Sequence, residues 1–502
     1  MQYGLTTETP THSQLSTRSE SMNPSNVPIF DLVVIGGGPA GVSGALAAGI
    51  MGKSVGLVEK AAQVGGAGIN TGTIPSKTLR ETALMLSGWR SRQLLGVDLS
   101  LRREATVLDF MRHAKHVTAS ERERADLQLS LRGVTKFRGE ASFVDTNTIR
   151  ILADDGGESW IRGTKFLIAT GSSPLRPPEF PFEDDRVHDS NEILELKTLP
   201  KKLIVIGGGV IGSEYACTFA ALGAEVHVID GRETLLPFLD TEISRGLTEA
   251  MIANGINFHW NEKVVMCDAS RRGDVNLTLQ SGATITGDGV LVCAGRSSNT
   301  ESLNLIGAGL TPGKRGLVQV GPNYQSLEAT HIYAAGDVVG PPALAATAIE
   351  QARIAVCHAF DDALMCEISP ILPTGIYTIP EASCVGDTEA SLIEKGIRYV
   401  IGRTRYLDIP RGEIIGDRQG FLKLLFRRND MRLLGVHVMG EQATEVVHIG
   451  LTAMLMNATA ELFLRTCYNY PTLGDLYKYA AYDAVLQIRK ERSNSAAATS
   501  FD

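Results

Sequence analysis

Two glycine-rich segments with the same spacing limit what this 502-residue chain can fold into. Residues 36–41 and residues 207–212 both read G-x-G-x-x-G. Each segment follows a β-branched run typical of a buried strand and precedes a run of small residues typical of a helix. A further strand-like run follows each helix. The chain is therefore predicted to contain two strand–turn–helix–strand units, from two domains or one duplicated domain.

The first segment has the features of a turn that cradles a dinucleotide pyrophosphate. Gly36 permits the tight turn, Gly38 lets the backbone approach the phosphates, and Gly41 allows the helix to pack closely on the strand. The start of the helix presents free N–H groups to the phosphates. Glu59 ends the second strand, where its carboxylate can accept hydrogen bonds from a ribose diol.

The second segment repeats this pattern at Gly207, Gly209 and Gly212, and Asp230 ends its second strand. An acid at that position favours NAD(H) and repels a 2′-phosphate. Arg232 is either a charge on a surface loop or a partner for that phosphate, and the sequence leaves both interpretations open.

The order of strand-like and helical runs predicts an α/β protein with two Rossmann-like dinucleotide-binding domains and a C-terminal α+β domain. Further helices are expected over 105–132, 343–358 and 441–456. The expected division is a disordered tail at 1–28, a first discontinuous domain at 29–165 and 294–366, a second domain at 166–293, a C-terminal domain at 367–490, and a tail at 491–502.

Composition excludes several classes of function. The net charge is −8 and basic residues are spread along the chain, which argues against nucleic acid or an anionic membrane as a partner. Residues 32–52 are uncharged over the length of a membrane span, but glycines break the run, so a buried strand, turn and helix are expected. No signal peptide is recognised.

The 7 cysteines show no C-x-x-C or C-x4-C spacing, which suits reduced thiols in a cytoplasmic protein. The sequence contains no metal-ligand signature, so no metal site is expected.

Short motifs in a fixed order carry a resemblance to a known family. Residues 72–77 read Gly-Thr-Ile-Pro-Ser-Lys, residues 169–171 read Ala-Thr-Gly, and residues 335–337 read Ala-Gly-Asp. With the two glycine-rich segments, these motifs resemble the pyridine nucleotide–disulfide oxidoreductases over about residues 29–490. The resemblance implies that the first domain binds FAD without a covalent bond, that the second binds NAD(P), and that the C-terminal domain forms a homodimer.

The resemblance also assigns roles to single residues. Thr170, Gly171 and Gly336 are expected in the FAD site, with Asp337 on the ribityl chain. Gly295 begins a segment that closes the nicotinamide domain.

Lys77 resembles the lysine of this family beside flavin N5, and Glu214 resembles its carboxylate partner. An ammonium there favours the negative charge that accumulates on reduction. A purely structural ion pair between two domains is the alternative interpretation.

The departures from the family affect its thiol chemistry. Gly68 and Thr73 occupy the positions of the two redox cysteines, so no dithiol can form. At the C-terminal half-motif the family places a histidine just before a proline and a glutamate a few residues later. This sequence has Tyr470 before Pro471, and Asp475 follows. Both halves of the thiol machinery are replaced, while both nucleotide segments remain.

Thr73 in place of the second cysteine, the run 373–381 and the run 470–472 resemble one branch, the soluble FAD-containing NAD(P)+ transhydrogenases. This resemblance implies ping-pong hydride transfer between NADPH and NAD+ through flavin N5, without a disulfide, in a homodimer or larger oligomer. The alternatives are an FAD-dependent diaphorase or oxidase that reduces quinone or oxygen, and a non-catalytic flavoprotein. That branch usually lacks the acid found here at Asp230, which leaves the affinity for NADP(H) open.

Overall fold

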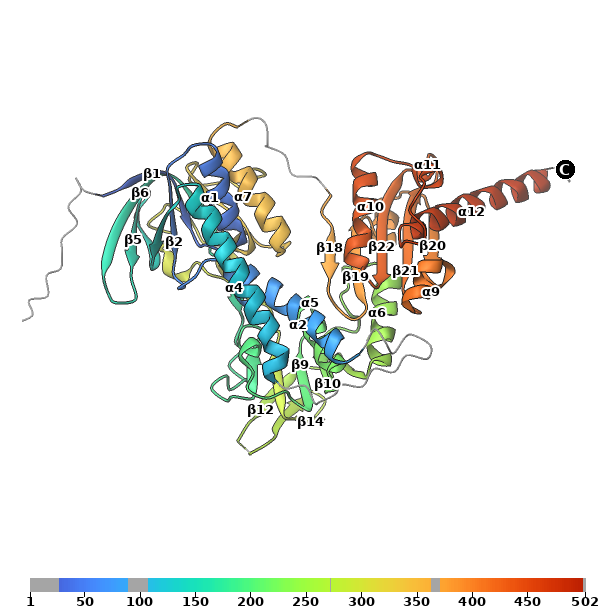
Figure 1. The fold of residues 1–502 in the computed structure, drawn as a ribbon, viewed down its shortest axis with the longest axis horizontal. Helices are drawn as coiled ribbons and strands as arrows, with labels where there is room; N and C mark the ends of the chain where they lie inside the picture. The colour runs from blue at the N-terminus through green and yellow to red at the C-terminus, as the bar shows by residue number, and fades with distance from the viewer. Residues whose placement is uncertain (1–26, 89–106, 271, 363–370, 500–502) are drawn as a thin grey trace, which may run out of the picture.

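The computed structural model describes residues 27–88, 107–270, 272–362 and 371–499 (Figure 1). A seven-stranded sheet in the order β3-β2-β1-β6-β5-β4, with β17 beside β6, forms the first domain. Its strands are β1 (Ile29–Ile35), β2 (Val55–Glu59), β3 (Thr135–Arg138), β4 (Glu140–Asp145), β5 (Thr148–Leu152), β6 (Glu158–Ile168) and β17 (Ile332–Ala334). Strands β3, β2, β1, β6 and β17 are parallel neighbours, so their carboxyl ends lie at one edge.

Helices α1 (Pro39–Ile50), α4 (Val107–Leu131) and α7 (Ala345–Ala359) cover this sheet, and α2 (Thr73–Leu86) lies beyond it (Figure 1). Small residues let α1 approach the sheet closely. A Cβ on Gly44 would lie 2.3 Å from Leu167 Cδ2. A π-helical turn, η2 (Ala67–Thr71), precedes α2.

The second domain is built around a five-stranded parallel sheet in the order β11-β10-β9-β15-β8. Its strands are β8 (Val187–Asp189), β9 (Lys202–Ile206), β10 (Glu225–Asp230), β11 (Ile256–Trp260) and β15 (Gly289–Val292), with helices α5 (Val210–Ala221) and α6 (Thr241–Ala253). A smaller antiparallel sheet comprises β12 (Val264–Asp268), β13 (Val275–Leu279) and β14 (Thr284–Gly287). The ribbon of β7 (Ser172–Pro174) and β16 (Arg296–Ser298) connects the two domains.

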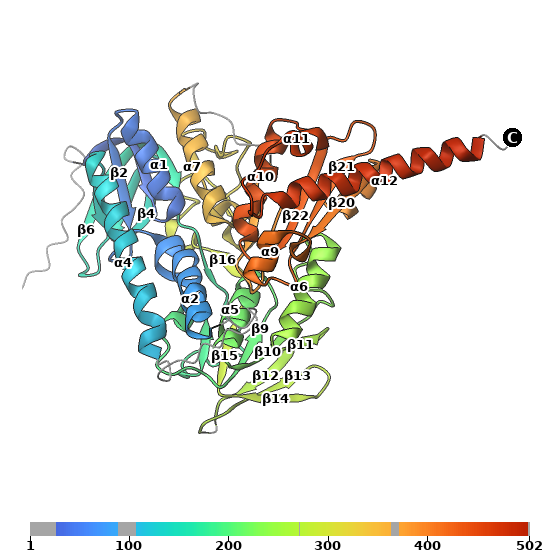
Figure 2. The same ribbon diagram turned by 45° about the vertical axis from the view of Figure 1, so that its right-hand side comes forward.

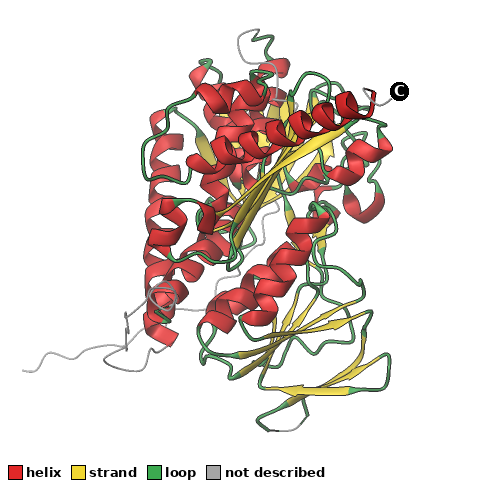
Figure 3. Cartoon of the chain, turned by 90° about the vertical axis from the view of Figure 1, so that its right-hand side faces the viewer, coloured by secondary structure: helices red, strands yellow, loops and turns green. Residues whose placement is uncertain are grey.

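The C-terminal domain contains an antiparallel sheet in the order β18-β19-β22-β21-β20. Its strands are β18 (Thr374–Ile376), β19 (Glu381–Gly386), β20 (Tyr399–Arg405), β21 (Phe421–Arg427) and β22 (Leu433–Gly440), and its helices are α8 (Glu389–Glu394), α9 (Pro410–Ile415), α10 (Ala443–Leu455), α11 (Ala460–Arg465) and α12 (Asp475–Thr499). Helix α12 crosses this sheet and then projects away from the rest of the chain (Figures 1 and 3).

The α/β architecture and the strand–turn–helix–strand units agree with the sequence prediction. The uncharged run 32–52 forms β1, a turn and α1. None of the described helices has the length and apolar character that would let it cross a membrane.

Two boundaries differ from expectation. Strand β6 continues past residue 165 to Ile168, because Phe166–Ile168 pair with both β1 and β17 of the first sheet. The tail expected from residue 491 is helical as far as Thr499, and the alanines at 496–498 favour that conformation. Residues 1–26 of the expected N-terminal tail lie outside the described residues.

Candidate functional site

One cavity of about 1070 Å³ lies at the carboxyl ends of the first parallel sheet and extends to α5, β18 and α10. This is the edge of an open α/β sheet where ligands bind. The predicted site residues that line it are Gly36, Gly38, Glu59, Lys77, Thr170, Gly171, Glu214, Gly336 and Asp337. The structure therefore places these expected FAD-binding residues in one cavity with Lys77 and Glu214.

The glycines of the first segment fit a dinucleotide cradle. Gly36 has φ +102°, and a Cβ there would lie 2.5 Å from Ala169 O. A Cβ on Gly41, beneath the cavity, would lie 1.8 Å from Gly36 O, so these two positions serve the fold. At Gly38 the nearest atom to a Cβ is Gly66 Cα at 3.7 Å, which leaves the space above the turn open to a ligand.

Two helix N-termini open onto this cavity without a side-chain cap. Helix α1 has Gly38 as its N-cap and no acidic residue in its first turn. Helix α7 begins at Ala345, and Leu344, Ala345 and Ala346 line the cavity. Uncapped N–H groups and the positive end of a helix dipole suit a phosphate or another anionic group.

Glu59 has hydrogen-bonding capacity left for a ligand. Its Oε2 accepts from Gly37 N at 2.7 Å, and its Oε1 accepts from Ala61 N at 2.8 Å. These contacts fix the side chain at the cavity wall. Because an ionised carboxylate has about four acceptor positions, a ribose diol can still donate to it.

Asp337 is held by residues that the sequence did not single out as site residues. Ser172 Oγ donates to Asp337 Oδ2 at 2.5 Å, and Arg296 Nε donates to Ser172 Oγ at 2.7 Å. Nearby, Thr170 Oγ1 is buried without a hydrogen-bond partner among the described residues. An orphaned hydroxyl beside an oriented carboxylate fits a site that receives a polar ligand.

Lys77 and Glu214 meet across two domains. Lys77 Nζ of α2 lies 2.6 Å from Glu214 Oε2 of α5, and these side chains are 26% and 8% exposed. Glu214 Oε1 accepts from the backbone N–H of Tyr377 at 2.9 Å, and the ammonium lies 5.0 Å from the Tyr377 ring centroid. The partly exposed ammonium therefore faces the cavity with its direction fixed.

No cysteine lines this cavity among the described residues, whereas Gly68 and Thr73 do. Burial raises the pKa of the Cys217 thiol to about 12, and burial likewise raises the pKa of Cys293 to about 12. Both thiols are therefore protonated and unreactive near neutral pH. Tyr470 is 73% exposed and does not line the cavity.

The glycines of the second segment lie at the carboxyl end of β9 and do not line the large cavity, although Val210 and Ile211 between them do. A Cβ on Gly207 would lie 2.5 Å from Cys293 O, and one on Gly212 would lie 1.9 Å from Gly207 O. Gly209 has no atom within 4 Å of its Cβ position and is the uncapped N-cap of α5. Gly295, with φ +112°, turns the chain from β15 into β16. This segment thus has the same open cradle as the first.

Asp230 and Arg232 form a closed ion pair beside this second cradle. Asp230 Oδ1 accepts from Arg232 N at 2.8 Å and from Arg232 Nε at 2.9 Å. Asp230 Oδ2 accepts from Arg232 Nη2 at 2.6 Å and from Gly208 N at 2.6 Å. Burial raises the pKa of Asp230, but the contacts with Arg232 outweigh burial and hold that pKa below its usual range.

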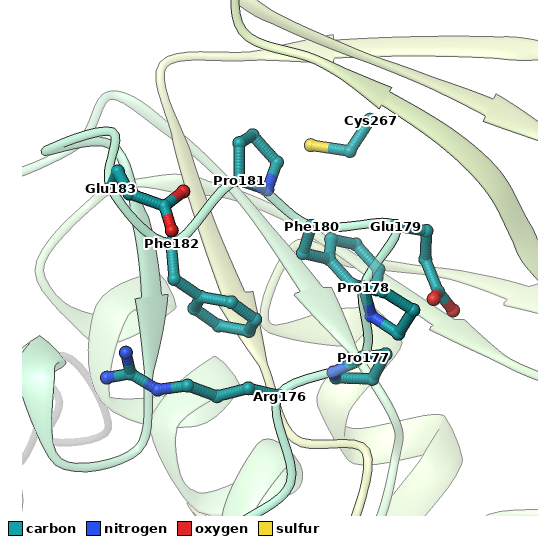
Figure 4. Close-up of a pocket in the computed structure, with 9 residues that line it drawn as sticks. All are labelled: Arg176, Pro177, Pro178, Glu179, Phe180, Pro181, Phe182, Glu183 and Cys267. Carbon is teal, nitrogen blue, oxygen red and sulfur yellow. The ribbon is translucent and has the colours of Figure 1, made fainter.

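Two other features lie apart from these sites. A pocket of about 530 Å³ on the loop between β7 and β8 is lined by the proline-rich run 177–182 and Cys267 (Figure 4).

Asp240, Glu242 and Glu389 form an acidic cluster, but Lys423 Nζ lies among them, 2.7 Å from Asp240 Oδ1. The ammonium takes the position a cation would need.

The residues that sequence reasoning missed come mostly from distant segments. Their only sequence signals are their places beside recognised motifs: Arg296 follows Gly295, and Arg80 lies one helical turn after Lys77. Cavity residues that were not anticipated include Ser172, Asn191, Arg296, Thr444 and His448.

Comparisons with known proteins agree with this geometry. A sequence model of the pyridine nucleotide-disulphide oxidoreductases matches residues 30–352, and one of their dimerisation domain matches residues 372–481. The soluble pyridine nucleotide transhydrogenase of Mycobacterium tuberculosis (strain ATCC 25177 / H37Ra) is 42% identical over 92% of this chain and 98% of its own. The enzyme of the same name from Hahella chejuensis is 39% identical over 91% of this chain and 99% of its own.

Solved structures show the same fold. LpdA from Mycobacterium tuberculosis has a TM-score of 0.83 at 27% identity, covering 91% of this chain and 99% of its own. The HOCl-induced flavoprotein disulfide reductase RclA from Escherichia coli has a TM-score of 0.80 at 25% identity, covering 89% of this chain and 99% of its own. The chain therefore belongs to the pyridine nucleotide-disulphide oxidoreductase family, as a flavin- and nicotinamide nucleotide-dependent oxidoreductase on the branch of the soluble pyridine nucleotide transhydrogenases.

Proposed function

We propose that this enzyme transfers hydride between NADPH and NAD+ by a ping-pong scheme through flavin N5, without a redox disulfide. The observation that carries the proposal is the makeup of the large cavity. It combines the Gly38 turn, Glu59 and Asp337, which we assign to FAD, and the Lys77 ammonium with Gly68 and Thr73, which offer no sulfur. The transhydrogenase names of the relatives support the choice of substrates.

In this proposal the first domain holds FAD without a covalent bond. Gly38 and the start of α1 receive the pyrophosphate, Glu59 accepts from the adenosine ribose, and Asp337 accepts from the ribityl chain. Gly36, Thr170, Gly171 and Gly336 supply close backbone approach. When bound, FAD supplies the hydride-accepting and hydride-donating chemistry.

The second domain holds the nicotinamide nucleotides in turn. Gly209 and the start of α5 receive the pyrophosphate, and Gly295 shapes the end of the site beside β15. Asp230 accepts from the ribose of NAD(H), and Arg232 pairs with the 2′-phosphate of NADP(H). Val210 and Ile211 at the start of α5 line the large cavity, so the second domain contributes to its wall.

Lys77 and Glu214 supply the electrostatics. The Lys77 ammonium stabilises negative charge near flavin N5. Glu214 holds the ammonium in place through its second hydrogen bond to Tyr377 N. The start of α7 adds the positive end of a helix dipole.

Anaerobic stopped-flow spectroscopy of the purified protein tests the proposal. NADPH should bleach the flavin absorbance, and NAD+ added afterwards should restore it. Steady-state rates with NADPH and an NAD+ analogue should give parallel double-reciprocal lines. Intersecting lines would require both nucleotides bound together, and faster reoxidation by oxygen or quinone than by NAD+ would identify a diaphorase or oxidase.

The assembly is part of the proposal. Because the dimerisation domain model matches residues 372–481, we propose a homodimer. The absence of paired cysteine spacings supports the proposal that it works in the cytoplasm. Light scattering during size-exclusion chromatography tests the assembly, and a monomeric mass would contradict it.

A further inference from the structure

A closed chain of contacts leads from Lys77 through the two other domains and back to its own helix. Lys77 Nζ contacts Glu214 at 2.6 Å, and Glu214 accepts from the backbone N–H of Tyr377 at 2.9 Å. The carbonyl of the next residue, Thr378, accepts from Arg80 Nε at 3.0 Å. Because Arg80 lies one turn after Lys77 on α2, the chain of contacts closes on itself. Figure 2 shows α2 and α5 side by side where the domains meet.

Arg80 is buried and fully engaged in this arrangement. The residue is 3% exposed, and its Nη2 lies 3.2 Å from Glu381 Oε1 of β19. Its Nη1 donates to Glu81 Oε1 at 2.7 Å. Glu381 is 7% exposed, and its Oε2 accepts from Thr444 N at 3.2 Å and from Thr444 Oγ1 at 2.8 Å. A guanidinium with five fixed donors holds planar acceptors in one relative orientation.

The position of the Lys77 ammonium depends on this orientation. A carboxylate from α5 and the ring of Tyr377 contact the ammonium from outside its own domain, and its contact with Ser76 Oγ of α2 is longer, at 3.4 Å. A lysine stem of four carbons has many rotamers, so the ammonium stays in one place only if both partners stay in register with α2. Arg80 provides that register because it ties α2 directly to the backbone after Tyr377.

We propose that Arg80 is a positioning residue for Lys77: it locks α2 to Thr378 and Glu381, and so fixes where the ammonium acts on the bound flavin. The inference rests on the proposed role of Lys77 beside flavin N5. It adds a residue that acts on the reaction only through Lys77 and touches neither nucleotide.

A double-mutant cycle on the FAD-loaded enzyme tests this inference. Wild type, Arg80→Met, Lys77→Met and the double variant are compared by the midpoint potential of the bound flavin and by the rate of flavin bleaching with NADPH. Arg80→Met should lower the potential in the same direction as Lys77→Met, and slow bleaching by about tenfold. In the Lys77→Met background the Arg80 substitution should have no further effect, because the group it positions is gone.

Three further variants separate positioning from general stability. Arg80→Lys keeps one donor to Thr378 and should restore part of both readouts. Arg403→Met removes another ion pair between domains, 2.9 Å from Glu242, and should leave the flavin potential unchanged. If Arg80→Met fails to hold FAD, Glu381→Gln provides a milder loss of the same contact.

Equal effects of Arg80→Met in both backgrounds, or an unchanged flavin potential in Arg80→Met or Lys77→Met, would overturn the inference. The proposed function fails by a different observation. If NAD+ does not reoxidise the reduced wild-type flavin, transhydrogenation is refuted, whereas the potentials still report on Arg80 and Lys77.

Discussion

Arg232 donates hydrogen bonds to both carboxylate oxygens of Asp230. The acid that was expected to repel a 2′-phosphate is therefore paired with a positive charge. The Arg232 side chain is 44% exposed and that of Asp230 is 6% exposed. The exposed partner can therefore turn toward a phosphate while the buried acid stays in place. We propose that this relationship allows one site to accept both nucleotides.

Arg232→Ala should weaken NADP(H) binding by about ten- to a hundredfold, because one charge-assisted contact with the 2′-phosphate is lost. NAD(H) binding should change little, since Asp230 is then free to accept from the ribose. Titration of both oxidised nucleotides by calorimetry measures the two effects. Equal losses for both would show that Arg232 only supports the loop.

Gly38→Val should give a colourless protein that still folds. Its Cβ has no protein atom nearer than 3.7 Å, but it would project into the space assigned to the pyrophosphate. Gly41→Val should instead yield little folded protein, because its Cβ would lie 1.8 Å from Gly36 O. Flavin content and circular dichroism distinguish the two outcomes. A Gly38→Val variant that still binds one FAD per chain would refute the assignment of this turn.

Reduction by two electrons should give ordinary reduced flavin, with no long-wavelength band from a thiolate next to the flavin. Neither Gly68 nor Thr73 offers sulfur, and dihydrolipoamide and oxidised glutathione should not turn over. Absorption spectra during anaerobic titration and steady-state assays check this expectation. Turnover of either thiol substrate would contradict the disulfide-free scheme.

Glu214→Gln should slow both half-reactions less than Lys77→Met does. Loss of the ammonium removes a preorganised charge, which is typically worth a factor of about 100 to 1000 in rate. A glutamine at 214 keeps a hydrogen bond and loses only the charge that holds Lys77. Single-turnover rates in each direction measure this order, and a larger loss for Glu214→Gln would give Glu214 a role of its own.

Lys423→Met should lower the free energy of unfolding by about 3–5 kcal/mol at pH 7, because it leaves the buried carboxylate of Asp240 without its cation. Lys423 is 0% exposed and contacts Asp240, Glu242 and Glu389. Urea unfolding of the loaded enzyme measures the loss. Arg405→Met, which removes an exposed pair with Asp408, is the control and should cost about 1 kcal/mol or less.

The free energy of unfolding that is lost in Lys423→Met should depend on pH. Burial raises the pKa of Asp240, but the hydrogen bond and charge of Lys423, the charge of His437 and the backbone N–H of Glu242 together hold that pKa below its usual range. The stability from a lowered carboxyl pKa is present above about pH 4 and is lost as the pH falls through the folded value. The difference between wild type and Lys423→Met should therefore shrink below about pH 4. A constant difference across this range would exclude Asp240 as the partner that matters.

The sequence by itself determined the elements around the two glycine segments. Gly36 and Gly207 permit turns with a positive φ, and Gly41 and Gly212 allow each helix to pack against its turn, where a Cβ would clash with a carbonyl oxygen. The runs of β-branched residues specify parallel strands buried on both faces. The family resemblance of these motifs predicted that Lys77 and Glu214 would be partners, and the two side chains meet at 2.6 Å.

Only the tertiary structure decided the contacts between segments that lie far apart in the chain. Arg80 reads as an ordinary helix arginine, and its burial against Thr378 and Glu381 depends on how the C-terminal domain docks on α2. The Asp230–Arg232 pair depends on a loop conformation that no periodicity encodes. Burial and pairing are properties of packing across domains, whereas a sequence pattern reports only which residues are neighbours along one strand or helix.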